Sequence, residues 1–175
     1  TSTTVLDQRI QLPWYITPVG SLRTLYPKAE AVAAKVAGQF GTVMGLSTLS
    51  GTPMEEVAEA SINSCWFQLY LCGGRETALR GIARAKKAGF TALVLTIDTS
   101  VSGQRLVHAR MKPLEAMRSW EGLTLHQKLQ SLRRIISLAP QMLPRFNWLL
   151  DFYADHGVME FVNIIDAEGK PMAFT

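Results

Sequence analysis

Four short apolar runs alternate with segments of helical pattern, and their spacing constrains the fold more than any other feature of the chain. The runs begin near residues 14, 42, 65 and 92, so successive starts are 28, 23 and 27 residues apart. A repeat of this length holds one strand, one helix and two short connections, which predicts parallel strands joined by right-handed crossovers. The predicted fold class is therefore α/β. Four such units make half of an eight-stranded barrel or most of an open, doubly wound sheet.

Local signals place the elements within this repeat. Thr52-Pro53-Met54-Glu55 is a capping box with proline at the first helical position, so a helix is expected to start there and run to about Ala60. Gly89 is expected to end another helix, because glycine is favoured just past a helix terminus. The predicted strands are 13–20, 41–48, 65–72 and a run that starts at Ala92, and the other predicted helices are 28–39 and 75–88.

Two observations favour the barrel over the open sheet. The first strand is not followed by Gly-x-Gly-x-x-Gly, the phosphate-binding pattern of dinucleotide-binding sheets. Polar residues recur at the carboxyl end of each strand, where the active-site face of a (β/α)8 barrel lies. We therefore predict a fold of the TIM-barrel family, with about four β/α units in residues 1–105 and a long active-site insertion in residues 106–175.

The composition is that of a globular protein. Hydrophobic residues make up 47% of the 175 positions and charged residues 18%, which argues against disorder. Cys65, Cys72 and three scattered histidines give neither a disulfide framework nor a metal-ligand spacing, so no metal is predicted. The first residues lack a signal-peptide pattern, and no apolar run reaches the roughly 18 residues of a spanning helix. A reducing, cytoplasmic environment is the expectation.

The positive charge is concentrated in one segment. Between Gly103 and Arg134 there are seven Lys or Arg and two Glu, which accounts for the whole excess behind the net charge of +4. Nucleic acid is one partner for such a segment, but no aromatic interleaving or recognition motif accompanies it. An acidic substrate or an anionic membrane surface explains the charge better.

The ends of the strands supply a set of candidate site residues. Neutral hydrogen-bonding groups suit the rim of a planar heteroaromatic ligand, an arginine fork suits a carboxylate, and an aspartate can orient a histidine. Taken singly, Gln68 could be a core amide, Tyr70 a core aromatic, Asp98 a helix cap and Arg105 a surface charge. Their joint placement at one end of consecutive strands favours a site. The candidates are the Val19–Gly20 backbone, Ser47, Gln68, Tyr70, Thr96, Asp98 and Arg105.

The same stretches resemble a known family. The motifs are V-M-G-L-S-T, F-Q-L-Y and L-T-I-D-T…G-Q-R, and they resemble those of the FMN-dependent 2-hydroxy-acid dehydrogenases and oxidases. T-P-V-G, L-Y-P-K-A-E and P-R-F-N-W-L-L-D-F are similar as well, most of all to the mandelate dehydrogenase branch. The resemblance implies an eight-stranded β/α barrel, FMN as cofactor, and oxidation of an (S)-2-hydroxy acid to the 2-oxo acid.

By that resemblance, one group of residues binds the cofactor. Val19 and Gly20 would lie against the flavin ring, with the Gly20 N–H near N5. Ser47, Gln68 and Thr96 would form hydrogen bonds with the polar edge of the ring.

A second group would act on the substrate. Tyr70 would contact the region of the substrate hydroxyl and carboxylate. Arg105 would bind the carboxylate and help to stabilise reduced flavin. Asp98 would hold a catalytic histidine in its working tautomer and stabilise its cation.

The resemblance also implies that this polypeptide is only part of an enzyme. In the family, the catalytic histidine, a neighbouring arginine, a flavin-facing lysine and the phosphate site belong to later strands. None of His108, His126 and His156 lies in the matching motif. We therefore expect residues 1–175 alone to be inactive, and expect the remaining half of the barrel, or a complementary chain, as a partner. A homo-oligomer is expected, since tetramers are common in the family. The alternatives are a flavin enzyme for an unusual substrate and a non-catalytic barrel fragment.

The segment 124–139 forms a basic amphipathic helix in our prediction, ended by Pro140 and Pro144. Its apolar side chains fall on one face and come from Leu125, Leu129, Leu132 and Ile136. One interpretation is a loop helix that packs over the barrel mouth. The other is peripheral attachment to a membrane, which the mandelate dehydrogenase resemblance encourages.

Overall fold

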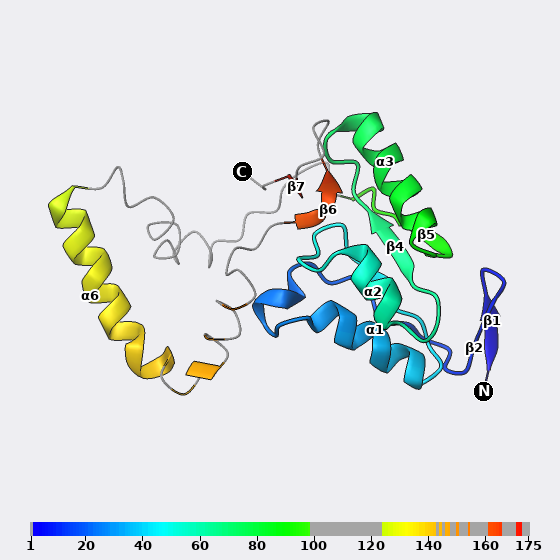
Figure 1. The fold of residues 1–175 in the computed structure, drawn as a ribbon, viewed down its shortest axis with the longest axis horizontal. Helices are drawn as coiled ribbons and strands as arrows, with labels where there is room; N and C mark the ends of the chain where they lie inside the picture. Colours follow the sequence, from blue (N-terminus) through cyan, green and yellow to red (C-terminus); the bar gives the residue numbers. More distant parts are fainter. Residues whose placement is uncertain are drawn as a thin grey trace.

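The chain forms a three-stranded parallel sheet with helices along it (Figure 1). The computed structural model describes residues 2–98, 124–142, 144, 146–147, 150, 154, 161–165 and 171–172. The elements are β1 (Thr3–Val5), β2 (Gln8–Ile10), a 3-10 turn η1 (Leu22–Thr24), α1 (Ala29–Gln39), β3 (Gly45–Leu46), α2 (Met54–Ala60), β4 (Trp66–Leu69), α3 (Gly74–Lys87), β5 (Ala92–Leu95), α6 (Leu125–Met142), β6 (Phe161–Ile165) and β7 (Pro171–Met172). The sheet order is β3-β4-β5, with β3 parallel to β4 and β4 parallel to β5.

The predicted strand–helix repeat is confirmed, although the strands are shorter than expected. The predicted first strand is reduced to one parallel bridge between Ile16 and Met44. Two hydrogen bonds hold it, from Ile16 N–H to the carbonyl of residue 43 at 2.9 Å and from Gly45 N–H to Ile16 O at 2.8 Å. Pro13 and Pro18 flank the bridge and cannot donate to a ladder, which explains why pairing does not extend.

Helix α3 ends as its sequence predicts. Gly89 has a φ of 92°, a left-handed conformation that glycine adopts without a Cβ penalty. The Gly89 N–H donates to Lys86 O at 3.2 Å, and the Phe90 N–H donates to Ala85 O at 3.0 Å. These two bonds make a Schellman motif. Phe90 then packs against the core beneath the helix.

The period of two along each strand divides the sheet into two faces. On one face, Met44, Leu46, Phe67 and Leu69 pack against the buried sides of α1, α2 and α3. The other face carries the alternate positions. At the end where the strands begin, Val43 and Trp66 pack on this face with Ile10 of the β1–β2 hairpin. At the carboxyl ends of the strands, the same face carries the predicted site residues.

The β1–β2 hairpin covers the end of the sheet at which the strands begin. Its turn is formed by Leu6 and Asp7, both with positive φ, and its second strand ends in buried Ile10. The Gln8 side chain accepts a hydrogen bond from Trp66 Nε1 at 3.1 Å and donates to Ser64 O at 3.3 Å. The hairpin was not predicted, because Leu-Asp lacks the glycine or asparagine that usually marks such a turn.

The capping box predicted for α2 does not form. The Thr52 hydroxyl donates instead to Glu30 Oε2 at 2.8 Å, and Pro53, at the cap position, supplies no side-chain bond. The Met54 N–H is satisfied by Asn163 Oδ1 of β6 at 2.9 Å. The start of the helix was therefore placed correctly, but its cap comes from a distant part of the chain.

Residues after β5 add a helix and two short strands in the described part. Helix α6 runs two residues past Pro140, so the prediction that this proline ends the helix is wrong. Pro140 is third from the end, where its missing N–H affects only the last turn. Strands β6 and β7, which were not predicted, pair antiparallel. Among the described residues, no helix is long and apolar enough to cross a membrane.

An ion pair ties α2 to α3 and gives a pH-dependent stability. Arg84 donates from two nitrogens to the Glu55 carboxylate, each at 2.6 Å, and from a third to Val162 O of β6 at 2.8 Å. The hydrogen bond from Arg84 lowers the pKa of Glu55 below its usual 4.5. A carboxyl whose pKa is depressed by folding contributes stability above its unfolded pKa and loses it as pH falls through the folded pKa.

We therefore expect Glu55→Gln to lower the free energy of unfolding at pH 7 by at most about 1 kcal/mol, because this carboxylate is half exposed. The difference from wild type should vanish at a pH below the folded pKa of Glu55. Denaturant unfolding at both pH values measures it, with Glu59→Gln on the same helix as control. An equal deficit at neutral and acidic pH would contradict the assignment.

Candidate cofactor-binding edge

Three predicted residues meet at the carboxyl ends of β3, β4 and β5. Ser47 Oγ donates to Gln68 Oε1 at 3.2 Å, and Gln68 Nε2 donates to Thr96 Oγ1 at 2.7 Å. Ser47 and Gln68 are each 4% exposed. We call this row of side chains the Ser47–Gln68–Thr96 ladder. It crosses all three strands at one level, as the strand-end pattern of the sequence predicts.

The orientation of the Gln68 amide is fixed by a backbone donor. Thr48 N–H donates to Gln68 Oε1 at 3.1 Å, so this atom must be the carbonyl oxygen. One N–H of the amide is used by Thr96. Within the part of the chain that the structure describes, the second Gln68 N–H and the Thr96 hydroxyl hydrogen have no acceptor, so both can donate to a ligand. The ladder can therefore offer donors to a ligand placed on this face of the sheet.

Thr48 is a structural part of the site that the sequence candidates do not include. Its hydroxyl donates to Gln68 O and accepts from Tyr70 N–H, the latter at 3.1 Å. Thr48 thus ties the end of β3 to the backbone of Gln68 and Tyr70 at the end of β4. Its position directly after Ser47, at the end of an apolar run, was the signal for it.

The Val19–Gly20 turn lies beside the ladder. A Cβ at position 20 would stand 3.8 Å from Ser47 Oγ and 3.3 Å from Leu49 Cβ, so glycine lets the backbone approach closely. Ser21 N–H donates to Leu49 O at 2.9 Å and anchors the turn to the end of β3. Val19 and Gly20 are both exposed, which leaves this turn accessible to a ligand.

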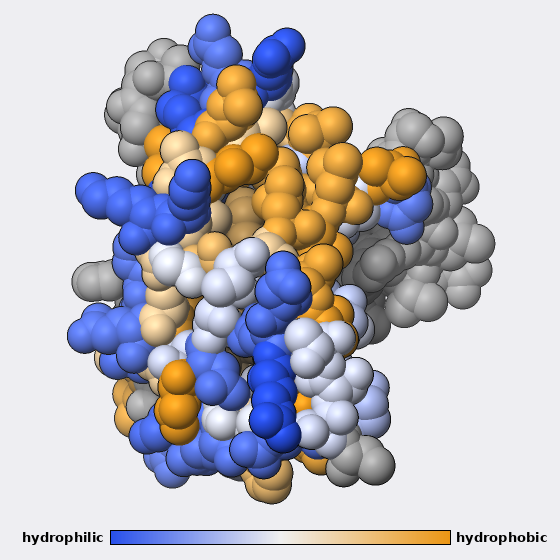
Figure 2. Space-filling model, turned by 90° about the vertical axis from the view of Figure 1, so that its right-hand side faces the viewer, coloured by the Kyte–Doolittle hydropathy of each residue, from blue (hydrophilic) through white to orange (hydrophobic). Residues whose placement is uncertain are grey.

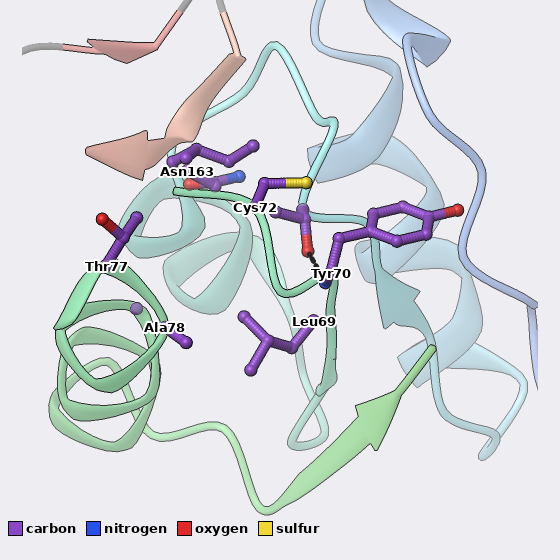
Figure 3. A pocket seen from close by; sticks show the side chains of 9 residues that line it. Leu69, Tyr70, Cys72, Thr77, Ala78 and Asn163 are labelled. Carbon is purple, nitrogen blue, oxygen red and sulfur yellow. Dashed lines mark hydrogen bonds between the residues drawn. The ribbon is translucent and has the colours of Figure 1, made fainter. Parts of the chain in front are cut away.

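The other predicted residues are placed in part. Tyr70 follows β4, and its ring points away from a depression lined by Cys72, Thr77 and Asn163 (Figure 3). Asp98 lies two residues past Thr96 and is exposed. Arg105 lies outside the described residues, so its predicted role stays a prediction.

The described residues contain no cluster of three His, Cys, Asp or Glu side chains that could hold a metal. Burial raises the pKa of both thiols, so Cys65 and Cys72 are held as neutral groups. The Ser47–Gln68–Thr96 ladder itself consists of neutral hydrogen-bonding groups.

Comparison with known proteins identifies the family. The model of the FMN-dependent dehydrogenases matches residues 1–149. The chain belongs to the FMN-dependent dehydrogenase family. The resemblance drawn from the sequence motifs is thereby confirmed, and with it the TIM-barrel fold class and FMN as the cofactor of this family.

Individual relatives agree with the family assignment. Pre-mycofactocin synthase of Mycobacterium tuberculosis (strain CDC 1551 / Oshkosh) is 34% identical over 86% of this chain and 34% of its own length. Glycolate oxidase of Spinacia oleracea is 32% identical over 71% of this chain and 35% of its own. A crystal structure of the monotopic membrane protein (S)-mandelate dehydrogenase superposes with a TM-score of 0.70 at 29% identity, covering 97% of this chain and 41% of that one. The chain thus spans about a third of the length of these curated relatives.

The described residues fit an FMN-dependent dehydrogenase. The polar edge of a flavin alternates acceptors and a donor, and the ladder presents free donors from an amide and a hydroxyl at the carboxyl ends of parallel strands. Gly20 leaves a side-chain-free surface next to Ser47. These residues suit the ring of the cofactor. Among the described residues we identify no binding site for its phosphate.

Proposed function

We propose that this chain supplies the flavin-edge half of an oxidoreductase that oxidises an (S)-2-hydroxy acid to the 2-oxo acid. The observation that carries the proposal is the Ser47–Gln68–Thr96 ladder, a buried amide locked by a backbone donor and flanked by two hydroxyls. Such a preorganised row suits a planar ring with fixed donor and acceptor positions. The family match and the glycolate oxidase and mandelate dehydrogenase relatives support the substrate class.

In the proposed reaction, FMN supplies the hydride acceptor. The ladder holds and polarises the polar edge of the ring, and Gly20 leaves room for the ring beside Ser47. Tyr70 and Arg105 bind the hydroxyl and carboxylate of the acid, which orients its α-hydrogen. Asp98 orients a histidine that comes from outside residues 1–175 and takes the hydroxyl proton.

The direct test is to purify the full-length protein, release and identify its cofactor, and measure 2-oxo acid formed from glycolate, lactate and mandelate. FMN in the protein and formation of a 2-oxo acid are expected. FMN without oxidation of any hydroxy acid would favour the alternative of a flavin enzyme for a different substrate. Failure to bind FMN would favour a non-catalytic barrel protein.

A second proposal concerns peripheral attachment to a membrane. Leu125, Leu129 and Ile136 of α6 are 75%, 52% and 63% exposed, and they lie on one face of the helix. Helix α6 lies away from the sheet in Figure 1. Exposed leucines beside Lys128 and Arg133 match an interfacial helix that inserts its apolar face between anionic headgroups. The similarity to a monotopic membrane protein supports this proposal.

We expect Leu129→Glu to reduce co-sedimentation of the full-length protein with anionic vesicles by at least about tenfold, since it removes apolar area and adds repulsion. The control is Leu79→Glu, which changes an exposed leucine on α3. High salt should weaken wild-type binding. Equal sedimentation of wild type with and without vesicles would leave α6 as a loop helix.

A further inference from the structure

Strand β6 is attached to the helices by a buried asparagine. Asn163 is 3% exposed, its Oδ1 accepts from Met54 N–H at 2.9 Å, and its Nδ2 donates to Thr52 O at 3.0 Å. The neighbouring Val162 carbonyl accepts from Arg84 at 2.8 Å. The oxygen and the nitrogen of the Asn163 amide therefore both form hydrogen bonds with the backbone at the start of α2, which we call the α2 junction.

That junction depends on Asn163. The first N–H groups of a helix lack partners within the helix and need a cap. Pro53 gives no side-chain bond, and the Thr52 hydroxyl is engaged with Glu30. Without Asn163, the Met54 N–H would be buried without its hydrogen-bond acceptor, and the Thr52 carbonyl would keep only the donor from Ser50.

A chain of hydrogen bonds connects this junction to the Ser47–Gln68–Thr96 ladder. Ser50 Oγ donates to Thr52 O at 3.0 Å and accepts from Thr52 N–H at 3.1 Å. Ser50 N–H donates to Ser47 O at 3.2 Å, and Ser47 Oγ donates to Gln68. Ser50 is fully buried and Thr52 is 3% exposed, so water is not available at these two residues to replace a lost bond.

Figure 3 shows Asn163 of β6 near Leu69 and Tyr70 at the end of β4. Asn163 and Ile164 of β6 line one small depression together with Thr48, Leu69 and Tyr70. Thr48 and Tyr70 are joined there by the hydrogen bond drawn in the figure. Strand β6 thus lines the same depression as Thr48, the residue whose N–H donates to the Gln68 side chain.

We propose that Asn163 is a positioning residue that couples the docking of β6 to the geometry of the Ser47–Gln68–Thr96 ladder, and through it to flavin affinity. The coupling to flavin rests on the proposed function. Coupling free energies are reciprocal, so FMN binding also strengthens the docking of β6.

The test compares Asn163→Leu, Asn163→Asp and the control Val162→Thr in the full-length protein. FMN affinity is measured by fluorescence titration, and amide hydrogen exchange of residues 47–54 is measured in the FMN-free protein. For Asn163→Leu we expect about tenfold weaker FMN binding and faster exchange. At pH 8 the ionised carboxylate introduced by Asn163→Asp retains the acceptor for Met54 N–H but not the donor to Thr52 O. The carboxylate would be buried beside the Thr52 carbonyl oxygen, which repels it, so this variant should lose FMN affinity as well. Val162→Thr should match wild type.

Each outcome decides the matter. Weaker FMN binding together with faster exchange in both Asn163 variants supports the coupling, as does protection of the β6 region from protease by FMN in wild type but not in Asn163→Leu. Unchanged FMN affinity in Asn163→Leu, with normal binding by wild type, overturns the coupling and leaves the proposed function intact. A wild-type protein that binds no FMN overturns the proposed function and the flavin part of this inference, whatever the exchange rates show.

Discussion

Replacing Gln68 with leucine in the full-length protein is expected to lower FMN affinity by about 100-fold, or about 2.8 kcal/mol. Leucine removes the acceptor for Ser47 and for the Thr48 N–H, and the donor to Thr96. It leaves the Thr48 N–H buried without its partner, which costs about 1–3 kcal/mol. It also removes the amide donor that we propose for the flavin ring. Flavin fluorescence titration of the purified protein measures the change.

Two further variants make this prediction specific. Gln68→Glu keeps the acceptor for the Thr48 N–H but removes the amide donors, and its carboxylate would take up the Thr96 hydroxyl hydrogen. This variant should therefore bind FMN more weakly than wild type. Gln39→Leu places the same substitution as the test variant at an exposed position on α1 and should have no effect. FMN affinity within about twofold of wild type in Gln68→Leu would show that the ladder does not face the cofactor.

The second large effect concerns the polypeptide of residues 1–175 by itself. We expect its rate of 2-hydroxy-acid oxidation to be at least about 10³-fold below that of the full-length protein, because general-base catalysis alone contributes that order of magnitude. Of the three histidines, His126 is in the described part, and it contacts Gln130 within α6. Turnover of both proteins with added FMN measures the ratio.

The sheet itself gives a structural reason for this expectation. Strand β5 pairs with β4 on one side, and no further strand pairs with it among the described residues. Leu93, Leu95 and Ile97 are 44%, 51% and 81% exposed. Strand β5 lies on the right-hand side of the molecule in Figure 1. Figure 2 shows that side, and its upper half carries a broad hydrophobic area. Such an edge and face are what a further β/α unit would cover.

Adding the remaining barrel as a second chain should restore turnover, and a second chain carrying a replaced histidine should not. The prediction would be contradicted if residues 1–175 oxidised a 2-hydroxy acid at a rate near that of the full-length protein.

The site edge was predictable from the sequence because it depends on local rules. Ser47, Gln68 and Thr96 each stand at the end of an apolar run, and parallel strands bring such ends to one level. Alternation along the strands then places them on the face away from the helices. The family motifs identified the same residues independently.

Other features depend on contacts that no local pattern encodes. The cap of α2 comes from Asn163, 109 residues after Met54, because Glu30 competes for the Thr52 hydroxyl that a capping box would use. The β1–β2 hairpin turns at Leu6-Asp7, which is not one of the glycine-containing pairs that mark a two-residue hairpin turn. Pro18 blocks extension of the first strand, so a predicted strand becomes a single bridge.

The central claim is that the ladder holds the flavin of a 2-hydroxy-acid oxidoreductase, and anaerobic mixing of the FMN-loaded full-length protein with an (S)-2-hydroxy acid tests it most directly. We predict loss of the oxidised-flavin absorbance with one 2-oxo acid formed per flavin, and no such loss with the (R) enantiomer. A flavin spectrum that stays unchanged with glycolate, lactate and (S)-mandelate would contradict the claim.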